Sequence, residues 1–477
     1  MTANNEDKYV GYLCIANASD DDLFAYVCTS KNLSVIEDWM ASIRQNDVDT
    51  VSNKTDNKKD DRNKSPKTDD EEEITGIDRL FKMLTDFGEA VSSYSPLIAA
   101  SSFTIPAMRT NYIEQEMLAH AETHFDVHQE NLRFKTFAVP KSGLRTISEQ
   151  VRKLREFDKG SSVLPGAILL SLVATFDSFI AETIRFILEE KPELMNASEK
   201  KLTVKEIIEL GGVDEIKKRI TEEEINSIMY ASHHDQVLYI EKKLNLTIIK
   251  NIDYWNNFIE IFERRNLVAH GKCIVNNTYL KKCKECGVDI SQINIGDTLD
   301  LKKDYMKNSA STLLIFGTSL MFSVAMKFFK NEKDRIFQFI GEHAFRMIKE
   351  GQYKVAHKLM DLALNRQTTS PSDAVRRTMI VNYASCLRHM GKTSEAHAVL
   401  DAEDWSATTG VYKICVHALK EEIEHVLDLM DKLMPSNELE KDDFIEWPAF
   451  KWARDDERVA EKFESIYGEP LTAIGTV

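Results

Sequence analysis

Apolar residues recur three or four positions apart along most of this chain, which is the pattern of helices with one buried face. The widest stripe lies between Leu164 and Glu190, and it contains Leu169, Leu172, Val173, Phe176, Phe179, Ile180, Ile184 and Ile187. A shorter stripe has the same spacing at Ile77, Leu80, Phe81, Leu84 and Phe87. The pattern therefore predicts a mostly α-helical protein in which the region 75–161 is also helical.

The N-terminal part departs from this pattern. Between residues 8 and 30, two short apolar runs flank a polar segment, and runs of this length fit either a β-hairpin or short helices. Leu33–Arg44 has the spacing of one amphipathic helix. Asn46–Glu73 has no aromatic and almost no aliphatic side chain. We therefore predict a small N-terminal segment, 1–45, followed by a disordered linker, 46–74.

The most apolar run in the chain is Leu313–Phe329. It is shorter than the ~20 residues that span a bilayer, and Ser319, Ser323 and Lys327 interrupt it. We expect a buried last helix of a bundle, or part of a dimer interface, and no membrane span.

Beyond Glu332 two segments align at a spacing of 40 residues, Gly351–Asp361 and Gly391–Asp401, each with alanine five positions after the glycine. Each glycine would end one helix, and each alanine would let the next helix pack closely. This pattern resembles degenerate tetratricopeptide repeats, whose usual spacing is ~34 residues. The resemblance implies an α-solenoid of helix pairs over 333–477 with a concave binding face for a regulatory protein or trigger. A third pair over 411–433 lacks the glycine, and 447–468 resembles a terminal cap.

Composition and charge restrict the location and the partners. The 477 residues, 43% hydrophobic and 29% charged, suffice for roughly two to four globular domains. Seven scattered cysteines form no disulfide framework, and the start shows no secretion signal, so we expect a cytoplasmic protein. The net charge of −16 argues against broad, non-specific adhesion to nucleic acid. Any RNA contact would need a local basic patch, for which the candidates are Arg264, Arg265, Lys272, Lys281, Lys282 and Lys284.

Two patterns raise the possibility of a metal site. His120, His124 and His128 recur every fourth position, so on one helix face they could bind zinc or nickel. No His-Glu-x-x-His arrangement accompanies them, and the face drifts around the helix from the first histidine to the third. Cys283 and Cys286 form a pair with no second pair to complete a structural zinc site. We therefore predict neither a metal nor a cofactor.

Phe258–Lys272 carries the residues most suited to chemistry. On a helix that ends at Gly271, Asn266 and His270 share one face, and the long side chain of Arg265 reaches the same patch. Imidazole can move a proton near neutral pH, guanidinium suits a phosphate, and an amide can orient either partner. The alternative is purely structural, with Glu260 and Arg264 as a surface ion pair and His270 at a favourable helix end.

Glu263–His270, followed by Gly271 and by 275–280, resembles the signature of HEPN domains. In that family an Arg, a polar neighbour and a His four positions later form a metal-independent ribonuclease centre, and Arg265, Asn266 and His270 match it position for position. The resemblance implies a helical bundle over 162–332 that forms a homodimer with one composite site. It also implies a supporting polar residue on the first helix, for which Asp177 is the candidate, with Glu182 behind it. His233 and His234 have no metal-like partners and are interpreted as incidental.

Two functions fit these features. The first is a HEPN endoribonuclease of the toxin or phage-defence type, in which His270 is general acid or base, Arg265 binds the scissile phosphate and Asn266 orients one of them. The second is a non-catalytic scaffold, in which the bundle dimerises and the repeats recruit a partner protein. The complete Arg-Asn-x3-His motif favours the first function, and the acidic net charge favours the second.

Overall fold

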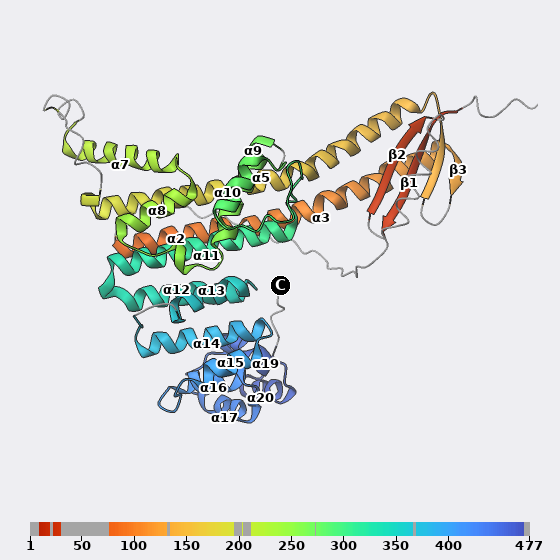
Figure 1. Cartoon of the computed structure of the whole chain (residues 1–477). Helices are drawn as coiled ribbons and strands as arrows, with labels where there is room; N and C mark the ends of the chain where they lie inside the picture. The colour runs from red at the N-terminus through yellow and green to blue at the C-terminus, as the bar shows by residue number, and fades with distance from the viewer. Residues whose placement is uncertain are drawn as a thin grey trace, which may run out of the picture.

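A computed structural model shows that the protein is mostly helical, as the apolar spacing predicts (Figure 1). The residues that the structure describes are 9–19, 22–29, 76–130, 134–194, 203, 211–271, 273–365 and 369–471. The predicted helix Leu33–Arg44 and the predicted linker 46–74 therefore lie outside the described residues.

The two short apolar runs near the N-terminus form a hairpin, and that hairpin belongs to a larger antiparallel sheet with the strand order β2-β1-β4-β3. The strands are β1 (Tyr9–Ser19), β2 (Asp22–Thr29), β3 (Asp126–Glu130) and β4 (Phe134–Pro140). In the register, Tyr12 lies opposite Cys28 on one side and Ala138 on the other. The prediction that all of 75–161 is helical is thus wrong for β3 and β4, which are too short to show a helical or strand period.

The sheet has a small core of its own. Three helical segments precede β3 along the chain, namely α3 (Tyr94–Tyr112), η3 (Ile113–Leu118) and α4 (Ala119–His124). Buried residues from the strands, from η3 and α4 and from the start of the next helix meet there, namely Leu13, Ile15, Ile113, Met117, Ala121, Phe137, Val139, Ile147 and Leu154. Residues on both sides of the 46–74 segment therefore build one structural unit.

Helix α5 (Leu144–Glu190) connects this unit to the bundle. Its 47 residues extend over roughly 70 Å at 1.5 Å per residue. Its first part packs on the sheet through Ile147 and Leu154, and the predicted apolar stripe of Leu164–Glu190 lies in the bundle. The predicted limit between the regions 75–161 and 162–332 therefore falls inside one continuous helix (Figure 1).

The main core is built on aromatic side chains from four helices, α2 (Gly76–Ser92), α5, α9 (Trp255–Gly271) and α11 (Lys303–Phe328). Phe258 of α9 stacks on Phe316 of α11 with 4.0 Å between the ring centroids. Phe176 of α5 lies edge-on to both rings. This packing fixes α9, the helix of the Arg-Asn-x3-His motif, against the centre of the bundle.

Two helices, α5 and α11, are long and apolar enough to cross a membrane by length and composition alone. The most apolar window of α11 is 72% buried against other parts of the protein. Its contacts with α2, α3, α5, α9, α12 and α13 are those of a core helix, which agrees with the prediction for Leu313–Phe329. The remaining bundle helices are α7 (Val213–Met229), α8 (His233–Leu244) and α10 (Asn277–Glu285).

The C-terminal part consists of helix pairs stacked below α11 (Figure 1). The pairs are α12 (Lys333–Lys349) with α13 (Tyr353–Asn365), α14 (Asp373–His389) with α15 (Thr393–Asp401), and α16 (Gly410–Leu419) with α17 (Ile423–Leu433). Gly351 and Gly391 have φ angles of +73° and +76°, in the left-handed region. In the third pair, Glu421 occupies the corresponding turn with φ +59°. The turn geometry is thus kept where the glycine is missing.

The chain ends in short helical segments that cover the last pair. They are α18 (Lys441–Glu446), η8 (Pro448–Phe450), α19 (Lys451–Arg454) and α20 (Glu457–Tyr467). Phe450 and Phe463 are fully buried, and Trp452 and Ile466 pack beside them. These four side chains pack into the core that the short segments share with the helix pairs.

Gly391→Ala should lower the free energy of unfolding by about 1 kcal/mol, because a Cβ is disfavoured at φ +76°. Urea unfolding followed by circular dichroism would measure the change. Gly271→Ala is the matched control, since Gly271 lies in a helix without a left-handed φ and its added Cβ would meet nothing within 4 Å. Equal effects of the two substitutions would contradict the prediction.

Candidate active site

Helix α9 presents the three motif residues differently. Its buried face carries Phe258 and Phe262, and the helix ends at Gly271 as expected. Arg265 and Asn266 are half-buried beside this face. His270, one turn beyond Asn266, is exposed at the end of the helix. The structure therefore separates the histidine of the motif from the sheltered environment of the arginine and the amide.

The neighbouring pair, Glu260 and Arg264, is not an ordinary surface ion pair. The Arg264 Nε lies 2.6 Å from Glu260 Oε1, and the two side chains are only 13% and 12% exposed. Tyr279 and Tyr305 donate their hydroxyls to Glu260 at 2.8 and 2.9 Å. Arg264 also lies over the Tyr305 ring and donates to the carbonyl of Asp300 at 2.8 Å. Burial and the Glu260 carboxylate raise the pKa of Tyr279, so its hydroxyl remains a donor at neutral pH.

Asp177 on α5 lies at the centre of a second group. Its Oδ1 is 2.7 Å from His233 Nε2, and its Oδ2 is 3.8 Å from a terminal nitrogen of Arg265. The His233 ring stacks on Phe262 with 3.5 Å between centroids, which holds the imidazole in place. The Arg265 Nε is buried and has no hydrogen-bond partner among the described residues. Arg265 thus keeps donors for a further acceptor.

His233 is a site residue that the sequence analysis dismissed as incidental. It lies 56 residues from Asp177 in the sequence, and no local pattern connects the two. The only local signal is Ser232, whose side chain accepts from the backbone N–H of Asp235 and so begins α8 at His233. Asp177, by contrast, lies beside Arg265 as the resemblance implied.

Burial lowers the pKa of His233, although the hydrogen bond to Asp177 opposes this effect. The imidazole is therefore neutral at neutral pH. With the Asp177 carboxylate oxygen as the acceptor of this hydrogen bond, Nε2 is the donor and Nδ1 keeps a lone pair. An imidazole held by a carboxylate in this way is suited to accept a proton at its other nitrogen.

These groups line one hollow with a volume of about 1030 Å³. Asn266 and Lys282 lie on its wall, and both contact Glu263, at 3.5 and 3.3 Å. The carboxylates and permanent cations that line it are Asp177, Asp235, Glu263, Glu285, Arg265 and Lys282. Carboxylates thus outnumber cations by four to two. His270 does not belong to the lining of this hollow.

The residues considered for metal binding are separated or buried. His120 and His124 stack in α4 at 4.3 Å, but the helix ends there and His128 lies on β3. The three imidazoles therefore do not share a helix face. Cys283 is buried, which raises its pKa to about 12 and disfavours the thiolate that binds zinc. Within the described ranges, no three His, Cys, Asp or Glu side chains could hold a metal ion together.

Comparison with known proteins identifies no relative, because no family model, no curated protein and no solved structure matches this chain.

Proposed function

We propose that this protein is a metal-independent endoribonuclease of the HEPN type that acts as a homodimer in the cytoplasm. The observation that supports this function most is the meeting of Asp177, His233, Arg265 and Asn266 in one hollow. Together they offer a guanidinium that can bind phosphate, an amide, and an imidazole that is hydrogen-bonded to a carboxylate. Groups of this kind can supply the proton transfer and the charge stabilisation that RNA cleavage needs, without a metal.

In this mechanism Arg265 binds the scissile phosphate, and Asn266 orients the phosphate or an imidazole. The 2′-oxygen attacks phosphorus while its proton moves to one imidazole, and the P–O5′ bond breaks while the other imidazole gives a proton to O5′. The products are a 2′,3′-cyclic phosphate and a 5′-hydroxyl. His270 supplies one of these imidazoles. His233, with Nδ1 free, supplies the other.

A dimer would give the exposed His270 a sheltered environment. The C-terminal end of α9 packs against α5, where Val268 lies close to Gly166. Large apolar side chains remain exposed along the adjoining helices, namely Leu97, Phe103, Met108, Val163 and Leu170. Exposed apolar side chains of this size are typical of an interface, which supports the homodimer that the resemblance implies.

The alternative is a non-catalytic dimerisation scaffold. The excess of carboxylates in the hollow favours it, because phosphate must displace or outweigh Asp177 to reach Arg265. In both cases the repeats would bind a regulator, and in the first case that regulator would keep a toxic or phage-defence activity under control.

The test is cleavage of total cellular RNA by the purified protein in excess chelator. We expect cleavage that persists, products with cyclic phosphate ends, and loss of activity in His270→Ala with the dimer intact. His425→Ala is the matched control, because His425 is another exposed helical histidine, on α17. Cleavage retained by His270→Ala would reject this mechanism. Absence of cleavage in every sample, including those with cell extract as a source of the regulator, would favour the scaffold.

A further inference from the structure

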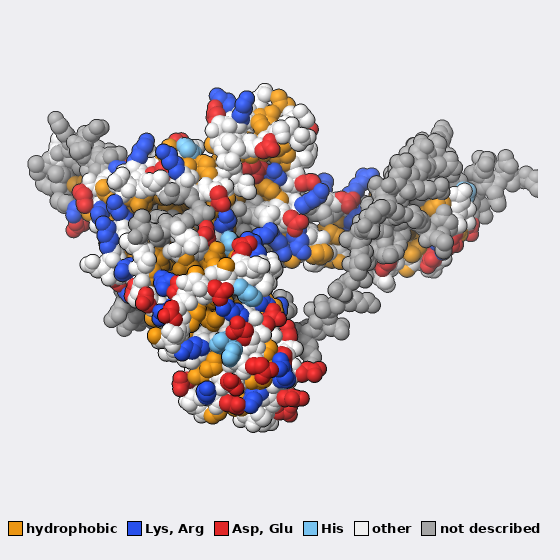
Figure 2. Space-filling view, turned by 60° about the horizontal axis from the view of Figure 1, so that its bottom comes forward, with side chains coloured by type: hydrophobic (Ala, Val, Ile, Leu, Met, Phe, Trp, Pro, Cys, Tyr) orange, Lys and Arg blue, Asp and Glu red, His pale blue; other side chains and the backbone are white. Residues whose placement is uncertain are grey.

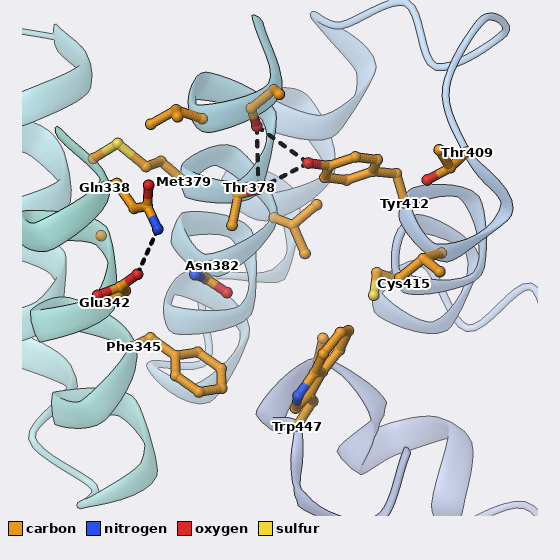
Figure 3. Close-up of a pocket in the computed structure, with 16 residues that line it drawn as sticks. Gln338, Glu342, Phe345, Thr378, Met379, Asn382, Thr409, Tyr412, Cys415 and Trp447 are labelled. Carbon is orange, nitrogen blue, oxygen red and sulfur yellow. Dashed lines mark hydrogen bonds between the residues drawn. The ribbon is translucent and has the colours of Figure 1, made fainter. Parts of the chain in front are cut away.

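A second hollow lies on the repeats, away from the proposed active site, and has a volume of about 560 Å³. Its walls come from the first helix of each pair, α12, α14 and α16, and from Trp447 beside η8 (Figure 3). No residue of α13, α15 or α17 lines it. We call this hollow the repeat groove. Its size falls in the ~300–1,000 Å³ range of pockets that enclose small ligands or short peptide segments.

Aromatic and aliphatic side chains dominate the repeat groove. Phe345 and Trp447 lie on two sides of it, Tyr412 reaches across to α14, and the buried Met379 also lines it (Figure 3). Tyr412 is held in place, because its hydroxyl lies 2.9 Å from Thr378 Oγ1 and 3.2 Å from the carbonyl of Ala374. Rigid rings around an open apolar space provide pockets for the side chains of a ligand.

One amide projects into the middle of these rings. Asn382 on α14 is half-buried, and it lies between Phe345 on one side and Cys415 and Trp447 on the other (Figure 3). Its side chain has no hydrogen-bond partner within the described part of the chain. An amide offers one acceptor oxygen and two donor hydrogens, which match the N–H and C=O groups of an extended peptide. A ligand with a peptide backbone would therefore satisfy it.

Charge indicates which side chains such a peptide would carry. Of the described residues that line the repeat groove, Glu342 alone is charged, and Gln338 donates to its carboxylate at 2.8 Å. The surrounding part of the protein is also acidic, since 401–471 contains nineteen Asp and Glu against eight Lys and Arg. Figure 2 shows these acidic side chains spread over the repeat end of the molecule. The field there favours a cationic ligand.

The chemistry of the cysteine in the repeat groove argues against covalent capture. Cys415 is buried, and burial raises its pKa to about 12. It is therefore a thiol at neutral pH, and it contributes packing instead of a nucleophile.

We propose that the repeat groove binds an extended peptide segment of a partner protein, in which a large apolar residue is followed or preceded by Lys or Arg. The apolar side chain fills the space between Phe345, Tyr412 and Trp447. Asn382 hydrogen-bonds the peptide backbone, and Glu342 pairs with the basic residue. This inference does not depend on the proposed ribonuclease activity, and it would also hold for the scaffold.

The experiment is selection of peptides from a randomised ten-residue display library on the immobilised full-length protein. The selected peptides are then synthesised and measured by fluorescence polarisation. We expect enrichment of apolar residues next to Lys or Arg. Asn382→Ala should weaken binding of the best peptide about tenfold, because one or two backbone hydrogen bonds are lost. Glu342→Gln should weaken it about fivefold at low salt and less at high salt.

Matched controls lie outside the repeat groove, Asn365→Ala on α13 and Glu424→Gln on α17, and both should bind as the wild type does. Circular dichroism would show that the substitutions of the exposed Glu342 and the half-buried Asn382 leave the fold intact. The proposal is wrong if no peptide is enriched, if the enriched peptides are acidic, or if Asn382→Ala and Glu342→Gln bind them unchanged. It is also wrong if sedimentation shows self-association that Asn382→Ala abolishes, because the occupant would then be a second copy of this chain.

Discussion

Arg265→Ala should lower the rate of metal-independent RNA cleavage about a thousandfold, within the proposed function. The guanidinium is a permanent cation that lines the hollow, and removing one stabilising donor from a developing oxyanion costs about 10²–10³ in rate. Its buried Nε has no partner among the described residues, and its terminal nitrogen is 3.8 Å from Asp177, beyond hydrogen-bond distance. The Arg265 side chain thus lies near the Asp177 carboxylate but forms no hydrogen bond with it.

Single-turnover cleavage of a labelled RNA, in chelator, would measure this effect. Arg265→Lys should recover part of the rate, since it keeps the charge and loses the planar fork. Arg219→Ala is the matched control, because Arg219 is an exposed arginine on α7 that pairs with Glu223. A rate for Arg265→Ala within threefold of the wild type would exclude phosphate binding by this residue.

Glu260→Ala should lower the free energy of unfolding by about 3–5 kcal/mol. The substitution would leave the Arg264 guanidinium buried without its carboxylate, and two buried hydroxyls, those of Tyr279 and Tyr305, without their acceptor. Glu260→Gln should cost less, because the amide oxygen still accepts one of these hydrogen bonds.

Chemical unfolding followed by circular dichroism and by tryptophan fluorescence would measure the change. The double substitution Glu260→Leu with Arg264→Met should be less destabilising than Glu260→Ala, because it removes both charges together and fills the space. Glu285→Ala is the matched control, since Glu285 is a glutamate at the exposed end of α10. A loss below about 1 kcal/mol for Glu260→Ala would show that the network contributes little to stability.

Arg264 and Arg265 are adjacent in the sequence, but their side chains have different surroundings. Arg264 points to Glu260, Tyr305 and the loop at Asp300, where it anchors α9 to the following segments. Arg265 points to Asp177 on α5, where it lines the hollow. We therefore expect substitutions of Arg264 to affect stability first and substitutions of Arg265 to affect activity first.

The sequence by itself determined the features that depend on neighbours three or four residues away. These include the apolar face of Leu164–Glu190, the end of α9 at Gly271, the burial of Leu313–Phe329, and the turns at Gly351 and Gly391. The placement of Arg265, Asn266 and His270 on one helix could be predicted for the same reason. A helix repeats every 3.6 residues, so the residues that share one of its faces can be identified from a short stretch of sequence.

The tertiary structure alone decided the pairings between distant segments. Tyr12 lies opposite Ala138 in the sheet, and His233 of α8 meets Asp177 of α5 because both helices pack against α9. The role of Glu260 depends on Tyr279 and Tyr305, which come from two later helices. Helix α5 begins before the expected boundary, and Ile147 and Leu154 of its polar first part are buried in the core of the sheet. Such pairings depend on which surfaces of distant segments pack together, and the spacing of neighbouring residues does not predict this.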